Sequence, residues 1–161
     1  MTSNLFPTEQ QLCTAKILII DDEQAHVRVL EWALKQAKFA NYLSVTDSTQ
    51  ARDEFVRYNP DLVLLDLNMP KLDGFDVLQQ FQEMLPPDSF IPVLMLTGDN
   101  TSELRAKALT AGAHDFLNKP LDYTEVMLRI RNLLRTRYLF RQAQEMKAKF
   151  DLMSAASGTA K

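Results

Sequence analysis

The sequence predicts an α/β protein, built as a doubly wound, five-stranded parallel sheet with an extended carboxyl-terminal helix. Five short apolar runs each end at polar residues, which is typical of strands buried on both faces of a parallel sheet. Longer segments between them repeat apolar residues at helical spacing, and such alternation indicates helices on both faces. The chain has 161 residues, 46% of them hydrophobic, which suffices for one domain with a buried core.

The first half of the chain is expected to contain three of the strands. They are Lys16–Asp21, Tyr42–Thr46 and Leu62–Asp66. The apolar spacing predicts a helix from about Glu23 to Lys38 after the first strand. After the second strand, we expect Ser48 to cap a helix that ends near Asn59, because the residue before Pro60 avoids helical backbone.

The second half continues the same alternation. The expected elements are the helix Phe75–Met84, the strand Val93–Thr97 and the strand His114–Asn118. Asn100 with Glu103 resembles a capping box for the helix between these two strands, and Gly112 fits its carboxyl cap. Asp122 with Glu125 predicts the start of the last helix.

Composition narrows the class of protein. The single cysteine, Cys13, argues against a disulfide framework or a cysteine metal site. The start of the chain does not resemble a secretory signal, and no apolar run reaches the roughly 18 residues of a membrane span. We therefore expect a cytoplasmic protein that does not associate with a membrane. Charge is uneven, because residues 1–128 carry a net −9 and residues 129–149 a net +6.

Polar residues follow the predicted strands at one edge of the sheet. Asp21 and Asp22 follow the first strand, Asp66 ends the third, Thr97 ends the fourth, and Lys119 follows the fifth. In open α/β sheets, ligands bind where the carboxyl ends of the strands meet. Taken singly, these residues read as helix caps, an ordinary strand end and a solvated lysine. Together they favour a site for a divalent cation and a phosphoryl group.

The chemistry of this set can be assigned to single residues. Three clustered carboxylates repel one another unless a hard cation lies between them, and Mg²⁺ prefers such oxygen ligands. Asp66 is the candidate nucleophile, Lys119 would pair with the phosphoryl oxygens, and Thr97 could donate a hydrogen bond to them. Gly98 would leave room for the phosphoryl group. His26 and His114 have no metal-ligand spacing and read as structural residues.

Read together, these residues resemble the receiver domain of bacterial response regulators. The resemblance covers residues 15–135 and also uses Met69-Pro70-x-x-Asp73-Gly74, Thr97-Gly98 and Lys119-Pro120. It implies a flavodoxin-like fold with strand order 2-1-3-4-5. It also implies a phosphorylation-dependent signalling switch, in which Asp66 accepts a phosphoryl group from a sensor histidine kinase or a phosphotransfer protein.

The resemblance further assigns roles around Asp66. Mg²⁺ would be bound directly by Asp22, Asp66 and the backbone carbonyl of Asn68, while Asp21 acts through metal-bound water. The Lys119–Pro120 peptide would be cis. Thr97 and Phe116 would form the switch, with Phe116 rotating inward when Thr97 moves toward the phosphoryl group. Asn68 and Asp99 flank the site and would control the access of water.

The chain departs from a bare receiver after residue 135. Residues 1–14 read as a lead-in, 136–153 as a helical extension and 154–161 as a disordered tail. A heptad seam of five residues predicts a short coiled coil and a possible homodimer: Leu139, Ala143, Met146, Phe150 and Met153. No DNA-binding domain follows in this chain, so its output would come from partners, a dimer or a further domain.

Three other functions would use parts of the same pattern. A phosphatase of the haloacid dehalogenase type would need a second aspartate where Asn68 stands, so we do not expect an enzyme. A flavin-binding module would need a phosphate loop after the first strand, where Asp21, Asp22 and Glu23 would repel phosphate. The basic helix could contact nucleic acid or anionic lipid, although a solvated linker explains it more simply.

Overall fold

The computed structural model describes residues 5–158. Within them the strands are β1 (Lys16–Ile20), β2 (Asn41–Val45), β3 (Leu62–Asp66), β4 (Val93–Thr97) and β5 (Asp115–Asn118). The helices are α1 (Glu9–Leu12), α2 (Gln24–Gln36), α3 (Ala51–Tyr58), α4 (Gly74–Met84), α5 (Ser102–Thr110) and α6 (Tyr123–Gly158), with a 3-10 turn at Ser48–Gln50. The five strands pair in parallel in the order β2-β1-β3-β4-β5, which confirms the predicted fold class.

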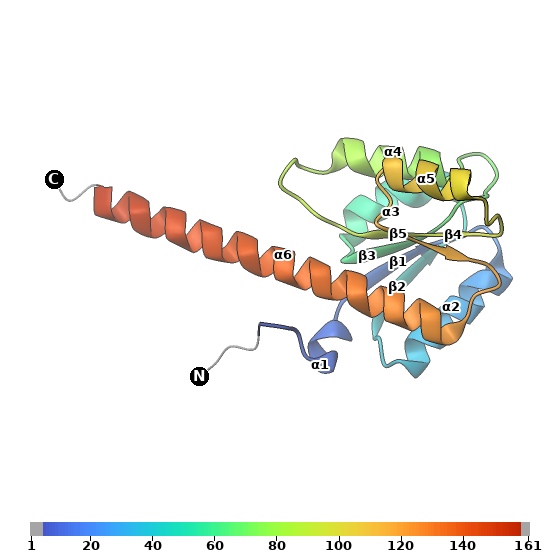
Figure 1. The fold of residues 1–161 in the computed structure, drawn as a ribbon, viewed down its shortest axis with the longest axis horizontal. Coiled ribbons are helices and arrows are strands. Elements are labelled where there is room, and N and C mark those ends of the chain that lie inside the picture. Colours follow the sequence, from blue (N-terminus) through green and yellow to red (C-terminus); the bar gives the residue numbers. More distant parts are fainter. Residues whose placement is uncertain (1–4, 159–161) are drawn as a thin grey trace.

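The sheet is covered by helices on both faces, as Figure 1 shows. Helices α2 and α6 lie on one face, and α3, α4 and α5 lie on the other. Successive strand residues point to opposite faces, so Ile17 and Ile19 of β1 join one core while Leu18 and Ile20 join the other. All four are fully buried, which explains why a central parallel strand reads as a continuous apolar run.

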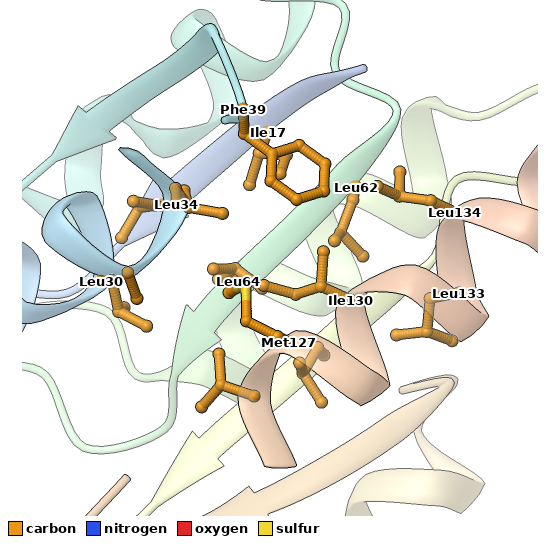
Figure 2. Packing of buried hydrophobic residues seen from close by; sticks show 14 of the residues in the cluster. Ile17, Leu30, Leu34, Phe39, Leu62, Leu64, Met127, Ile130, Leu133 and Leu134 are labelled. Atoms are coloured by element: carbon orange, nitrogen blue, oxygen red, sulfur yellow. The ribbon is translucent and has the colours of Figure 1, made fainter. Parts of the chain in front are cut away.

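The core between β1, β3, α2 and α6 is a cluster of mostly aliphatic side chains that also contains Phe39 (Figure 2). Leu64 of β3 lies beside Met127 and Ile130 of α6 in this cluster. Burying one such side chain contributes roughly 1.5–3 kcal/mol relative to leaving it in water. This packing therefore fixes the first part of α6 against the sheet.

Helix boundaries follow local capping chemistry. Asp73 caps α4 in a capping box with Asp76, and Asp122 accepts a hydrogen bond from the Glu125 amide, as expected for the start of α6. Gly112 follows α5 with a φ of +104°, which suits a glycine carboxyl cap. The predicted Asn100–Glu103 box is wrong, because Thr101 caps α5 instead.

The prediction that Ser48 caps the following helix is also wrong. Asp47 takes the capping position by accepting a hydrogen bond from the Thr49 amide. The Ser48 hydroxyl instead donates to the Pro70 carbonyl and accepts from the Leu72 amide. Ser48 is therefore buried as a brace for the loop after β3, which a local capping rule does not reveal.

Both ends of the described chain are more ordered than expected. The predicted lead-in contains α1, which Thr8 and Gln11 close with a capping box. The predicted disordered tail is wrong for residues 154–158, which continue α6 to Gly158, while 1–4 and 159–161 lie outside the described residues. In the described chain, no helix is long and apolar enough to cross a membrane.

The middle of α6 is fastened to the body along one edge of the sheet. Glu9 of α1 pairs with Arg131 and Arg135 at 3.0 and 3.3 Å. Asp61, just before β3, pairs with Arg137 and Arg141 at 3.6 and 3.4 Å. Four arginines of α6 are therefore paired with two acidic residues of the same chain. Beyond Gln144, whose side chain donates to the Asp88 carbonyl, α6 projects away from the body (Figure 1).

Candidate phosphoryl and metal site

The predicted site residues meet at the carboxyl edge of the sheet. The parallel register pairs Asp66 at the end of β3 with Leu96, and Thr97 at the end of β4 with Asn118. Asp21 directly follows β1, and Lys119 directly follows β5. This edge of the sheet buries two carboxylates and a hydroxyl, from Asp21, Asp66 and Thr97. Acidic side chains are rarely buried in proteins unless they have a partner.

Three carboxylates form the acidic part of the site. One oxygen each from Asp21, Asp22 and Asp66 lie within 4.8 Å of one another. Asp22 is exposed, whereas the other two are buried. Oxygen ligands at such spacing suit a hard divalent cation, and an open side at Asp22 leaves room for water or phosphate oxygens. The donor set therefore fits Mg²⁺.

Lys119 connects two of the three carboxylates. Its Nζ atom donates to Asp66 Oδ1 at 2.9 Å and to Asp21 Oδ2 at 3.0 Å. Its side chain is 15% exposed, so these charge-assisted hydrogen bonds are partly shielded from water. The Lys119–Pro120 peptide is cis, as the resemblance implied.

Burial and nearby charges shift the pKa values of both Asp66 and Lys119. Burial raises the pKa of Asp66 above 3.8, and the nearby charges of Asp21 and Asp22 add to this, while Lys119 opposes it. Burial by itself would lower the pKa of Lys119, but its bonds to Asp66 and Asp21 outweigh that effect and raise it. Burial and the charges of Asp21 and Asp22 thus disfavour the negative charge of Asp66, and a bound cation would relieve this.

His26 is a member of the site that the sequence reading missed. Its Nδ1 atom lies 2.8 Å from Lys119 Nζ and 3.4 Å from Asp21 Oδ2. The structural interpretation of His26 from spacing was therefore incomplete. The available signal was its place in the first turn of the helix that follows Asp21 and Asp22, because that turn lies at the same edge of the sheet.

The remaining predicted residues line the rim or the interior of the site. Thr97 is fully buried, and its Oγ1 accepts a hydrogen bond from the Asp99 amide at 3.1 Å. A Cβ atom at Gly98 would meet nothing within 4 Å, so the space beside Thr97 is open. Asn68 and Asp99 are exposed, and Asp99 accepts from the Thr101 amide. The side chain of Phe116, which is expected to rotate inward, is already buried in this structure, with 4% exposed. The Arg105 guanidinium lies over its ring, 5.4 Å from the centroid.

Gly74 holds the loop after β3 close to the phosphoacceptor position. Its amide donates to the Leu67 carbonyl at 2.8 Å. A Cβ atom at Gly74 would lie 2.6 Å from the Asp66 carbonyl oxygen and 2.8 Å from Leu67 Cα. Because both contacts are with backbone, no side chain fits without a shift of the strand end.

Comparison with known proteins agrees with this geometry. The family model "Response regulator receiver domain" matches residues 17–131. The chain is 40% identical over 120 residues to the probable transcriptional regulator ycf27 of Porphyridium aerugineum, covering 74% of this chain and 48% of the relative. It is 33% identical over 147 residues to the response regulator PleD of Caulobacter vibrioides, covering 91% of this chain and 32% of PleD.

Solved structures give the same result. NtrX from Brucella abortus is 27% identical with a TM-score of 0.74, covering 83% of this chain and 29% of that one. The chain spans about half or less of the length of the curated relatives described above. The family match, the strand order and the clustered acidic residues agree. The chain therefore belongs to the response regulator receiver domain family, whose members are phosphorylation-dependent signalling switches.

Proposed function

We propose that Asp66 is the phosphoacceptor and takes its phosphoryl group from a sensor histidine kinase or a phosphotransfer protein. One observation carries the proposal. Lys119 binds both Asp66 and Asp21 within a carboxylate cluster that lies at the open edge of the sheet. A nucleophilic oxygen, a cation for the transferred group and a metal donor set are thus in one place.

The reaction can be written with its atoms balanced. An oxygen of the Asp66 carboxylate attacks phosphorus and forms a new P–O bond. The bond from phosphorus to the donor imidazole nitrogen breaks, and its electron pair returns to that imidazole. Lys119 pairs with the phosphoryl oxygens, and the Thr97 hydroxyl donates to them. Asp22, Asp66 and the Asn68 backbone carbonyl would hold Mg²⁺ directly, with Asp21 acting through metal-bound water, and the ion would supply charge neutralisation for the transferred group.

The signal would then pass to the surface through Thr97 and Phe116. Movement of Thr97 toward the phosphoryl group changes the packing beside Phe116, which borders α5 through Arg105. Asn68 and Asp99 stand exposed at the rim, where substitution would change how fast water removes the phosphoryl group. The chain acts in this account as a switch that is modified and reset, without turnover of a separate substrate.

The projecting end of α6 supports a further proposal, a homodimer through a parallel two-helix coil. Met146, Phe150 and Met153 recur at heptad spacing and are 71%, 70% and 73% exposed. Ion pairs within the chain already engage five arginines of α6, so charge repulsion between two copies is weaker than the sequence suggested: Arg129, Arg131, Arg135, Arg137 and Arg141. A second copy would cover the stripe.

Sedimentation tests the dimer with a matched pair of variants. Met146→Glu with Phe150→Glu places two charges on the stripe, whereas Ala148→Glu with Leu152→Glu places two charges on another side of α6. We expect the first pair to be monomeric and the second to associate like the wild type. A wild type that stays monomeric at tens of micromolar, roughly 7 kcal/mol of association, would refute the coil.

The phosphoacceptor proposal is tested with acetyl phosphate as the donor. Intact-mass measurement should show the gain of one phosphoryl group when Mg²⁺ is present and little gain when it is chelated. Asp22→Ala should need a higher Mg²⁺ concentration, because it removes one ligand. Steady hydrolysis of a generic phosphate ester would instead support the phosphatase alternative.

A further inference from the structure

We infer that His26 is a positioning residue for Lys119, holding its ammonium group in place while the other partners of that group change. This inference rests on the proposed function, since its consequence is read in phosphoryl transfer. The contact joins residues 93 positions apart, from the first turn of α2 to the loop after β5. Nothing in the local sequence around either residue points to the other.

The hydrogen-bonding capacity of Lys119 is filled by three acceptors. An ammonium group has three N–H donors and no acceptor. Its partners are Asp66 Oδ1 at 2.9 Å, Asp21 Oδ2 at 3.0 Å and His26 Nδ1 at 2.8 Å. These come from three separate elements, so the ammonium position is defined in three directions. His26 supplies the shortest of the three contacts.

The direction of the His26 bond follows from the donor inventory. Because Lys119 can only donate, Nδ1 must accept, and the ring proton of the neutral imidazole lies on Nε2. Glu23 Oε2 also lies 3.0 Å from Nδ1, which would suit a proton on that atom. The Glu23 side chain is 64% exposed and can rotate into water, whereas Lys119 is 15% exposed. The Lys119 bond therefore determines the tautomer.

The two carboxylate partners of Lys119 cannot serve as fixed anchors during the reaction. Asp66 becomes an acyl phosphate, and the Lys119 donor that it held turns to a phosphoryl oxygen. Asp21 belongs to the cluster that fits a cation, so its oxygens are shared with another charge. His26 is the partner among the three that is not a carboxylate, and the reaction forms no bond to it.

The backbone beneath His26 is well fixed. Its amide donates to the Glu23 carbonyl at 3.0 Å, and Glu23 in turn donates its amide to Asp21 Oδ1 at 2.9 Å. The next residue, Val27, is fully buried against the sheet. His26 therefore lies on a fixed helical turn that is hydrogen-bonded to Asp21, which Lys119 also contacts. This suits a residue that positions Lys119.

The test compares four proteins at one fixed pH. His26→Leu removes the acceptor but keeps a similar volume, and His26→Gln restores an acceptor through its amide oxygen. Gln24→Leu makes the same polar-to-leucine change on an exposed position of the same turn. We expect His26→Leu to accept phosphate from acetyl phosphate about tenfold more slowly, the scale of one hydrogen bond to a charged group. We expect His26→Gln to recover to within about twofold of the wild type, and Gln24→Leu to match it.

A second measurement follows the environment of the Lys119 ammonium group in the unphosphorylated protein. The NMR cross-peak of the Lys119 Nζ–H group should shift or broaden in His26→Leu and return in His26→Gln. Unchanged cross-peaks in His26→Leu would overturn the inference, and so would a changed cross-peak with an unchanged transfer rate. If the wild type takes up no phosphate at all, the proposed function fails, while the cross-peak still decides whether His26 holds Lys119.

Discussion

The two ends of strand β3 carry the same kind of side chain in opposite electrostatic settings. At the carboxyl end, Asp66 shares Lys119 with Asp21 and lies near Asp22, so acidic groups outnumber the cation. At the amino end, Asp61 pairs with Arg137 and Arg141 of α6 and accepts the Lys16 amide at 3.0 Å. There the cations outnumber the acid.

The difference explains why one end is suited to ligands, whereas the other pairs with α6 of the same chain. An excess of buried negative charge is costly unless a cation joins it, so the Asp66 end is suited to a metal and a phosphoryl group. At the Asp61 end, arginines from α6 supply the charge and no further partner is required. The position of an aspartate relative to a strand thus matters less than the balance of charge around it.

The largest effect on stability is expected where the carboxyl end is packed most closely. Gly74→Ala would force a Cβ atom against the backbone of Asp66 and Leu67, and overpacking of this kind costs roughly 1–3 kcal/mol. Gly98→Ala is the matched control, because a Cβ atom there meets nothing within 4 Å. Denaturant unfolding should separate the two variants. Equal unfolding midpoints would show that the loop after β3 yields easily.

A smaller loss of stability is expected when Asp61, at the amino end of β3, is substituted. Asp61→Ala leaves Arg137 without its carboxylate partner, and we expect unfolding free energy to fall by about 1–2 kcal/mol, less than for a fully buried pair. Asp151→Ala, at an exposed position of the projecting part of α6, should have almost no effect. If Asp61→Ala is as stable as the wild type, the amino end does not fasten α6.

Substitution of Asp66 is expected to raise the stability of the fold, and the size of this gain depends on pH. Because burial raises the pKa of Asp66, the folded chain binds its proton more tightly than the unfolded chain does. Stability from this group therefore falls as the pH rises from 3.8 through the raised value. In metal-free buffer, Asp66→Asn should unfold at a higher temperature than the wild type at pH 7, and the gap should shrink as the pH falls toward 3.8. A variant less stable than the wild type at pH 7 would contradict this.

The carboxyl end could be predicted from sequence because its signals are regular. Apolar runs end at Asp21, Asp66 and Thr97, and parallel strands bring their carboxyl ends together whatever their separation in the chain. The structure brings these residues together with Lys119, as the strand pattern required. Their individual roles stay predictions.

The missed features depend on contacts that no short window contains. Arg141 reaches Asp61 across 80 positions, and His26 reaches Lys119 across 93. The sequence showed a basic helix but not which acids it meets, so a solvated linker was expected for a segment that is fastened to the body. Ser48 was assigned by a local capping rule, whereas tertiary contact with the loop after β3 decides its role.

We expect the shortage of cations around Asp66, and not the mere presence of an aspartate at a strand end, to make this residue a phosphoacceptor. Asp61→Asn and Asp66→Asn make the same change at the two ends of β3. With acetyl phosphate and Mg²⁺, peptide mass mapping should find one phosphoryl group on the wild type and on Asp61→Asn, located on Asp66. Asp66→Asn should carry none. Labelling of Asp66→Asn at the wild-type level would contradict the account.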